Sequence, residues 1–84
     1  MLLLQPVPVR LDEIYVPAKL RATLDGKKVE ALAESILASG LQVPIRVRRD
    51  KARYVLVAGL HRLEAMRALG EATIPALVVR AAQH

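Results

Sequence analysis

The sequence contains no cysteine, no phenylalanine and no tryptophan, and Tyr15 and Tyr54 are its only aromatic residues. The absence of cysteine excludes a disulfide, a thiolate nucleophile and a cysteine-based zinc site, and it suits a cytoplasmic protein. The scarcity of aromatic rings nearly excludes base stacking as a mode of nucleic-acid recognition. The two histidines, His61 and His84, are far apart in the sequence, and we expect no metal centre.

Long apolar runs are also missing. The segment Met1-Leu2-Leu3-Leu4 is too short to span a membrane and lacks the basic start of a signal peptide, so we expect no membrane partner. A length of 84 residues predicts a single small domain, residues 1–84. Because 54% of the residues are hydrophobic and almost none are aromatic, the core of this domain must be aliphatic.

The formal net charge is +5, and the basic residues are clustered in two segments. One cluster lies between Lys19 and Lys28, just before an expected helix, and we interpret it as a contact for a polyanion such as a nucleotide. The other lies between Arg46 and Arg53, where a solvated surface is the simpler interpretation. The oligomeric state stays open, a homo-oligomer included.

Four strands are predicted from apolar patterns and flanking breakers: Val7–Leu11, Val43–Arg48, Tyr54–Ala58 and Thr73–Val79. The first should lie at a sheet edge, because Pro6 and Pro8 cannot donate ladder hydrogen bonds. The second alternates, with Val43, Ile45 and Val47 on its inner face. The third is apolar throughout, which is typical of a central strand that is covered on both faces.

Two helices are predicted, at Gly26–Ser39 and His61–Leu69. Asp25 is the expected N-cap of the first helix and Gly40 its end. The residues expected on its buried face are Val29, Leu32, Ala33, Ile36 and Leu37. In the second helix, Leu63, Met66 and Leu69 should face inward, and Gly70 should end it.

The remaining segments are expected to be irregular. They comprise Asp12–Asp25 with a basic loop at Lys19–Thr23, a hairpin turn at Arg49–Arg53, and a tail at Arg80–His84. The resulting order, β-α-β-β-α-β, predicts an α+β domain with one mixed sheet and two main helices packed on it.

The junction between the third strand and the second helix carries the clearest functional signal. Gly59 ends the strand, and His61 and Arg62 follow in the first turn of the helix. The free N–H groups and the positive dipole end of a helix N-terminus favour anions. A glycine lets an anion approach the backbone, and Arg62 is charged at any physiological pH. The pattern therefore predicts a phosphate-binding site.

At these residues the sequence resembles the ParB/sulfiredoxin superfamily, and in order and spacing it is similar to the N-terminal domain of ParB partition proteins. The resemblance extends from Val7 to Val79 and rests on the segments Leu32–Ile36, Gly40–Ile45, Tyr54–Ala65, Leu69–Gly70 and Ile74–Pro75. It implies a ParB/sulfiredoxin-like fold. Small stand-alone relatives of this kind are often called ParB-like nucleases.

The resemblance also implies a nucleotide site around Gly59, Leu60, His61 and Arg62. ParB proteins have Gly-Glu-Arg-Arg there and hold CTP phosphates, whereas sulfiredoxins have Gly-Cys-His-Arg and hold ATP phosphates. This sequence has Gly-Leu-His-Arg, with Leu60 in place of the sulfiredoxin cysteine. Because sulfiredoxin chemistry requires a thiolate, Leu60 excludes sulfinic-acid reduction.

Three further residues are implied in the site by the resemblance. Lys28 and Ser35 match a lysine and a threonine that reach ATP phosphates in sulfiredoxins, and they lie seven residues apart on one helix face. Ala31 replaces a serine between them, so one hydrogen bond is missing. Arg21 is the best match to the basic Gln-x-Arg-Arg segment of ParB proteins.

The expected function is binding of a nucleoside triphosphate, ATP or CTP with Mg²⁺, accompanied by slow hydrolysis at most and by weak, non-specific association with DNA. One alternative is a ParB-like nuclease or a small-molecule phosphotransferase that uses the same phosphate site. No group of acidic residues resembles a two-metal nuclease centre, which weakens the nuclease alternative. Another alternative is a protein-interaction module with a relic site. A complete partition clamp is not expected, because no helix-turn-helix or dimerisation segment is present.

Overall fold

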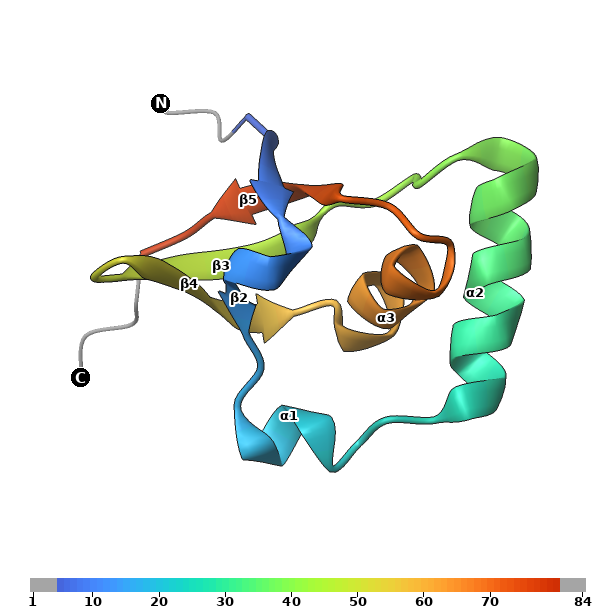
Figure 1. The fold of residues 1–84 in the computed structure, drawn as a ribbon, viewed down its shortest axis with the longest axis horizontal. Helices are drawn as coiled ribbons and strands as arrows, with labels where there is room; N and C mark the ends of the chain where they lie inside the picture. The colour runs from blue at the N-terminus through green and yellow to red at the C-terminus, as the bar shows by residue number, and fades with distance from the viewer. Residues whose placement is uncertain (1–4, 81–84) are drawn as a thin grey trace.

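Five strands form one mixed sheet in the order β1-β5-β3-β4-β2 (Figure 1). The computed structural model describes residues 5–80; Met1 to Leu4 and residues 81–84, which include His84, lie outside the described part. The strands are β1 (Val7–Arg10), β2 (Ile14–Tyr15), β3 (Ile45–Asp50), β4 (Arg53–Ala58) and β5 (Thr73–Val78). The helices are η1 (Leu11–Glu13), α1 (Ala18–Arg21), α2 (Gly26–Ser39) and α3 (Leu60–Ala68). The predicted α+β class is confirmed.

The sheet contains both strand directions. β1 pairs with β5 and β3 with β4 in antiparallel fashion, whereas β3 pairs with β5 and β2 with β4 in parallel. β1 lies at one edge, as its prolines predict, and Pro8 is paired with Pro75. Because Pro8 carries no N–H, this edge is less suited to pairing with a further strand.

The core is aliphatic, as expected from the composition. Its fully buried side chains come from the inner face of the sheet and from α3, and the largest are Ile45, Val47, Leu56, Leu63 and Ile74. Tyr54 is partly buried and packs against this cluster. The apolar strand β4 is covered on both faces at Val55 and Leu56, but Val57 is 42% exposed, and β4 lies next to the two-residue edge strand β2. The expectation of a fully covered central strand is therefore only partly correct.

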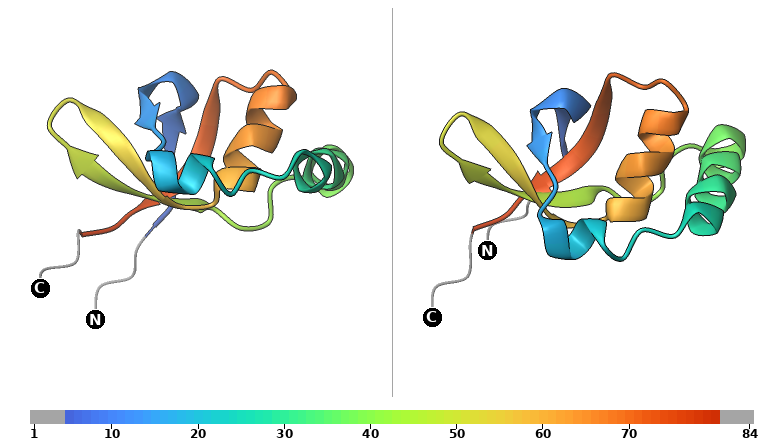
Figure 2. Two further views of the ribbon diagram at one scale, coloured as in Figure 1. Left: turned by 90° about the horizontal axis from the view of Figure 1, so that it is seen from below. Right: turned by 60° about the horizontal axis from the view of Figure 1, so that its bottom comes forward.

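Helix α3 lies between the sheet and α2, so the two main helices do not contribute equally to the core (Figures 1 and 2). Helix α2 has the predicted bounds. The Asp25 carboxylate caps it by accepting the N–H of Lys27 at 3.0 Å, and Gly40 follows it with φ 78°. None of its side chains is fully buried, and Leu37 is 78% exposed. The assignment of Leu37 to the buried face is wrong, because α3 covers only a narrow stripe of α2.

The segment before α2 is more ordered than the sequence indicated. The irregular stretch expected at Asp12–Asp25 contains part of η1, then β2 and α1, and the basic loop expected at Lys19–Thr23 begins as a helical turn. Pro17 occupies the N-cap position with φ −59°, a value that suits a helix start. These elements are two to four residues long and too short to produce a readable periodicity.

Smaller boundary differences concern β3, α3 and the hairpin. Strand β3 begins at Ile45, so Val43 lies outside it and is 54% exposed rather than facing inward. Helix α3 begins at Leu60, one residue earlier than expected. The β3–β4 turn is confined to Lys51 and Ala52. Within residues 5–80, no helix has the length and apolar character needed to cross a membrane.

Candidate functional site

The connection between β4 and α3 is a single glycine. Gly59 has φ 106° and ψ 31°, in the left-handed region, and its carbonyl accepts the N–H of Leu63 at 2.9 Å to start α3. The backbone N–H groups of Leu60, His61 and Arg62 occupy the first turn, where a helix offers no carbonyl partner. The helix start at this junction agrees with the sequence prediction within one residue, and the binding of an anion there remains a prediction.

Leu60 contributes only its backbone to this end of α3. Its side chain is 6% exposed and belongs to the hydrophobic core. The Leu60 side chain is therefore not available to a ligand at the helix N-terminus. Leu60 is thus part of the packing of α3 on the sheet.

His61 joins the two main helices. Its Nε2 accepts the backbone N–H of Asp25, the N-cap of α2, at 3.1 Å. This contact connects residues 36 positions apart and brings the N-termini of α2 and α3 to one place. The sequence favours a phosphate contact over a histidine satisfied within the protein, and it does not identify this partner, because nothing in the local sequence marks the acceptor of a distant backbone N–H.

Arg62 also has protein partners. Its Nη1 donates to the carbonyl of Pro44 at 3.0 Å and to that of Val43 at 3.3 Å. These carbonyls belong to the segment that leads from α2 into β3. The contacts use one of the three guanidinium nitrogens, so Arg62 can hold this segment and still present charge to an anion.

Ser35 and Arg62 line the same small cavity. The cavity has a volume of about 100 Å³, and its other lining residues are Leu32, Ile36, Gly40, Leu41, Gln42 and Val43. Pockets that enclose drug-sized ligands usually measure ~300–1,000 Å³. A ligand as large as a nucleotide would therefore place at most one of its groups here and lie mainly across the surface.

Lys28 and Arg21 are exposed. Lys28 lies in the first turn of α2, close in sequence to the Asp25 N-cap, and Arg21 is the last residue of α1. Ser35 follows Lys28 by two turns of the same helix. The predicted residues thus come from α1, α2 and α3, of which α2 and α3 are joined directly by His61.

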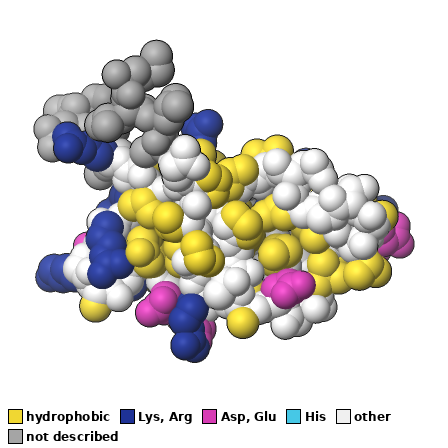
Figure 3. Space-filling view, turned by 90° about the horizontal axis from the view of Figure 1, so that it is seen from above, with side chains coloured by type: hydrophobic (Ala, Val, Ile, Leu, Met, Phe, Trp, Pro, Cys, Tyr) yellow, Lys and Arg dark blue, Asp and Glu magenta, His cyan; other side chains and the backbone are white. Residues whose placement is uncertain are grey.

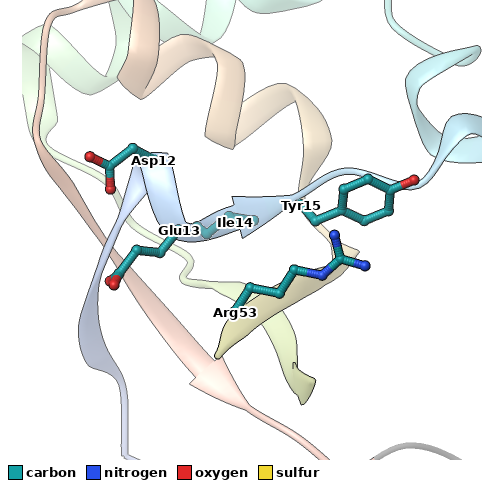
Figure 4. A pocket seen from close by; sticks show the side chains of 5 residues that line it. All are labelled: Asp12, Glu13, Ile14, Tyr15 and Arg53. Atoms are coloured by element: carbon teal, nitrogen blue, oxygen red, sulfur yellow. The ribbon is translucent and has the colours of Figure 1, made fainter. Parts of the chain in front are cut away.

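Another hollow lies away from the helix N-termini, next to β2 (Figure 4). Its volume is about 270 Å³, and it is lined by Asp12, Glu13, Ile14, Tyr15 and Arg53. The guanidinium of Arg53 lies over the Tyr15 ring, 4.2 Å from its centre. Among the described residues, no group of three or more His, Asp or Glu side chains is arranged to hold a metal ion.

Residues 4–84 match the sequence profile of the ParB N-terminal domain. The chain belongs to this family. A nucleoid occlusion protein from Halalkalibacterium halodurans is 38% identical over 58 residues, which cover 69% of this chain and 20% of that protein. The family therefore confirms the resemblance that the strand, glycine and helix motif indicated.

Three solved structures share the fold. Sulfiredoxin from Arabidopsis thaliana has a TM-score of 0.80 and 36% identity, covering 90% of this chain and 85% of that one. ParB from Caulobacter crescentus, C-terminally truncated and complexed with CTP-gamma-S, has a TM-score of 0.79 and 27% identity. The match covers 93% of this chain and 46% of that one. A free serine kinase (E30A mutant) in complex with AMP has a TM-score of 0.79 and 26% identity, covering 90% and 31%.

These relatives differ in length. The ParB family domain spans about a fifth of the nucleoid occlusion protein, less than half of the truncated ParB and about a third of the kinase, but most of the sulfiredoxin. Two of the three solved structures, the kinase and the truncated ParB, are complexes with AMP and CTP-gamma-S, respectively.

Proposed function

We propose that this domain binds a nucleoside triphosphate, ATP or CTP, with the phosphates at the joined N-termini of α2 and α3. The observation that carries the proposal is the hydrogen bond between the Asp25 N–H and Nε2 of His61, which brings these two helix ends together. Each helix N-terminus has the effect of about half a positive charge. Two of them at one place, beside Arg62, favour a multiply charged anion over solvent.

The side chains around the helix ends support the same ligand class. Lys27 and Lys28 lie in the first turn of α2, next to the Asp25 carboxylate, and they add positive charge beside the helix ends. The solved relatives include one complex with CTP-gamma-S and one with AMP. Phosphate groups are common to both ligands, so a phosphate site is the property that the comparison supports best.

Each predicted residue has a role in this proposal. The N–H groups of Leu60, His61 and Arg62 would hold one phosphate, with Ser35 and the Arg62 guanidinium beside them in the small cavity. Lys28 and Arg21 would neutralise the rest of the triphosphate from the solvent side. Mg²⁺ would be carried largely by the phosphate oxygens and water, as is usual for this ion.

Thermal unfolding with each of the four ribonucleoside triphosphates, with and without Mg²⁺, tests the proposal. A bound nucleotide at 100 times its Kd stabilises the folded domain by about 2.7 kcal/mol, a clear shift in a domain of this size. We expect a shift with ATP or CTP. No shift with any nucleotide at millimolar concentration would rule the proposal out.

A matched pair of variants locates the ligand. Lys28→Ala removes a charge beside the helix ends, whereas Lys51→Ala removes the same charge from the β3–β4 turn. We expect Lys28→Ala to weaken nucleotide binding by about three- to tenfold and Lys51→Ala to leave it nearly unchanged. Equal effects would indicate general attraction by net charge instead of a defined site.

A phosphotransferase that uses this phosphate site is the second candidate, favoured by the likeness to a free serine kinase bound to AMP. It predicts turnover of the nucleotide with Mg²⁺ that depends on a hydroxyl acceptor. Saturable binding with no more than slow hydrolysis would instead leave a nucleotide-binding domain as the function.

A further inference from the structure

The N-terminus of α2 lacks half of its expected cap. In a capping box, the N-cap side chain accepts an N–H of the first turn, and a Glu or Gln at the third helical position accepts the N–H of the N-cap residue. Asp25 fulfils the first part by accepting the Lys27 N–H at 3.0 Å. The third helical position is Lys28, whose ammonium has donors only.

The missing acceptor is supplied by the other helix. Nε2 of His61 accepts the Asp25 N–H at 3.1 Å, in the role that a Glu or Gln at position 28 would have. We propose that His61 is a positioning residue that completes the cap of α2 from α3 and thereby fixes the distance between the two helix N-termini. The cap itself is independent of any ligand, but its importance for binding rests on the proposed function.

Helix α2 has few other means of holding its position at this end. None of its side chains is fully buried, and its main packing partner is α3. In its C-terminal half, Ser35 lines one small cavity together with Arg62 of α3. At its N-terminal end, the hydrogen bond between Asp25 and His61 adds to the packing of the partly buried Val29. This contact therefore helps to set the position of Lys28 relative to α3.

The contact also fixes the chemical form of the imidazole. Nε2 can accept a hydrogen bond only without a proton, so a neutral His61 must carry its proton on Nδ1. A phosphate contact from the neutral ring would therefore come from Nδ1–H. An imidazolium has two donors and no acceptor, and it would release the Asp25 N–H.

The wild-type protein provides the first test, which requires no variant to fold. The ¹⁵N shifts of the imidazole distinguish the two neutral forms. At a pH where His61 is neutral, we expect a protonated Nδ1 and an unprotonated Nε2. A neutral ring protonated at Nε2 would overturn the proposal.

Two substitutions provide the second test. His61→Leu removes the acceptor, and His61→Gln replaces it with an amide oxygen. We expect the Asp25 amide to exchange with solvent about five- to tenfold faster in His61→Leu, the effect of losing one hydrogen bond, and to stay close to wild type in His61→Gln. An unchanged exchange rate in His61→Leu would overturn the proposal.

A rescue from within α2 tests the capping-box explanation directly. Adding Lys28→Gln to His61→Leu restores an acceptor at the third helical position, so protection of the Asp25 amide should return. Failure of this rescue would contradict the capping-box explanation. The wild-type protein could bind no nucleotide and still give the expected Asp25 exchange rates and His61 ¹⁵N shifts. In that case the proposed function is wrong, but the capping role of His61 is supported.

Discussion

A Cβ atom at position 59 would lie 2.6 Å from Cγ2 of Ile45 and 3.2 Å from its Cα. The backbone of Gly59 thus passes against a fully buried side chain of β3 at the point where β4 turns into α3. The glycine is required by the fold itself, in addition to any part it plays in admitting an anion.

Gly59→Ala should lower the free energy of unfolding by about 2–6 kcal/mol. A left-handed φ costs a non-glycine residue roughly 1–3 kcal/mol, and the contact with Ile45 adds a packing cost of similar size. Gly70, which follows α3, also has a positive φ of 76°, but a Cβ there would meet no atom within 4 Å, so Gly70→Ala should show only the backbone cost. Urea unfolding measures the loss of stability in each variant. Equal losses would show that the contact between the added Cβ and Ile45 contributes nothing.

Arg62→Ala should destabilise the domain by about 1.5–3 kcal/mol, because the carbonyls of Val43 and Pro44 lose a charged donor. Arg67→Ala is the matched control on the same helix. Its pairing with Glu64, at 3.5 Å, is near the surface and should contribute less than about 1 kcal/mol. Under the proposed function, only Arg62→Ala also weakens triphosphate binding, by roughly tenfold or more. Similar stability losses in the two variants would contradict the bridging role of Arg62.

Truncation of two leucines should have very different effects on stability. Leu63 is completely buried in α3, and Leu63→Ala should cost about 2–5 kcal/mol. Leu37 is 78% exposed, and Leu37→Ala should change the stability by less than about 0.5 kcal/mol. Thermal unfolding measures both. A large loss on Leu37→Ala would mean that this side chain is covered in solution.

The pKa of Asp12 should rise when Arg10 is replaced. The Arg10 guanidinium donates to both carboxylate oxygens, at 2.6 and 3.1 Å, and this hydrogen bonding, with a smaller contribution from its charge, holds the pKa of Asp12 below its ordinary value. Because the folded pKa is lowered, the contact stabilises the fold above the ordinary pKa, and this contribution is lost as the pH falls through the lowered value. A ¹³C titration should show an upward shift in Arg10→Ala and none in Lys51→Ala.

Association with DNA, where it occurs, should be weak and independent of sequence. On the face shown in Figure 3, several Lys and Arg side chains lie toward the left end of the molecule. The basic residues of the β3–β4 hairpin are partly engaged within the protein, because Arg53 pairs with Asp50 at 3.6 Å and Arg49 lies over the Tyr54 ring. Each phosphate contact lowers log affinity by about 0.9 per tenfold rise in salt, so few contacts leave little binding at physiological salt. Titration of two unrelated duplexes at two salt concentrations measures this. A sequence preference that survives added salt would contradict it.

Periodicity predicted the long elements well. The bounds of α2 were predicted from the Asp25 cap, the apolar spacing and Gly40, and all three act locally. Elements of two to four residues, such as β2 and α1, were missed because their order comes from neighbouring strands and from Pro17. The buried face of α2 was predicted to include Leu37, which is exposed. The sequence does not reveal that α2 packs mainly against α3, which covers a narrower face than a sheet would.

The candidate site was predicted as a set of residues but not as a set of contacts. The sequence motif indicates the N-terminal turn of α3, and the structure has that turn at Gly59. The acceptor role of His61 and the carbonyl partners of Arg62 join segments 18 to 36 residues apart. Such contacts depend on tertiary packing, which local patterns do not encode.

The pairing of β1 with β5 has a consequence for how the chain is made. These are the first and last strands of the described residues, and Val9 lies opposite Ile74 in the core. During synthesis on the ribosome, β1 emerges before β5. Because β1 pairs with β5, the sheet cannot be completed until nearly the whole domain has been synthesised. A nascent chain released before Thr73 would lack the only strand that pairs with β1 among residues 5–80 and would expose its apolar side to chaperones and proteases.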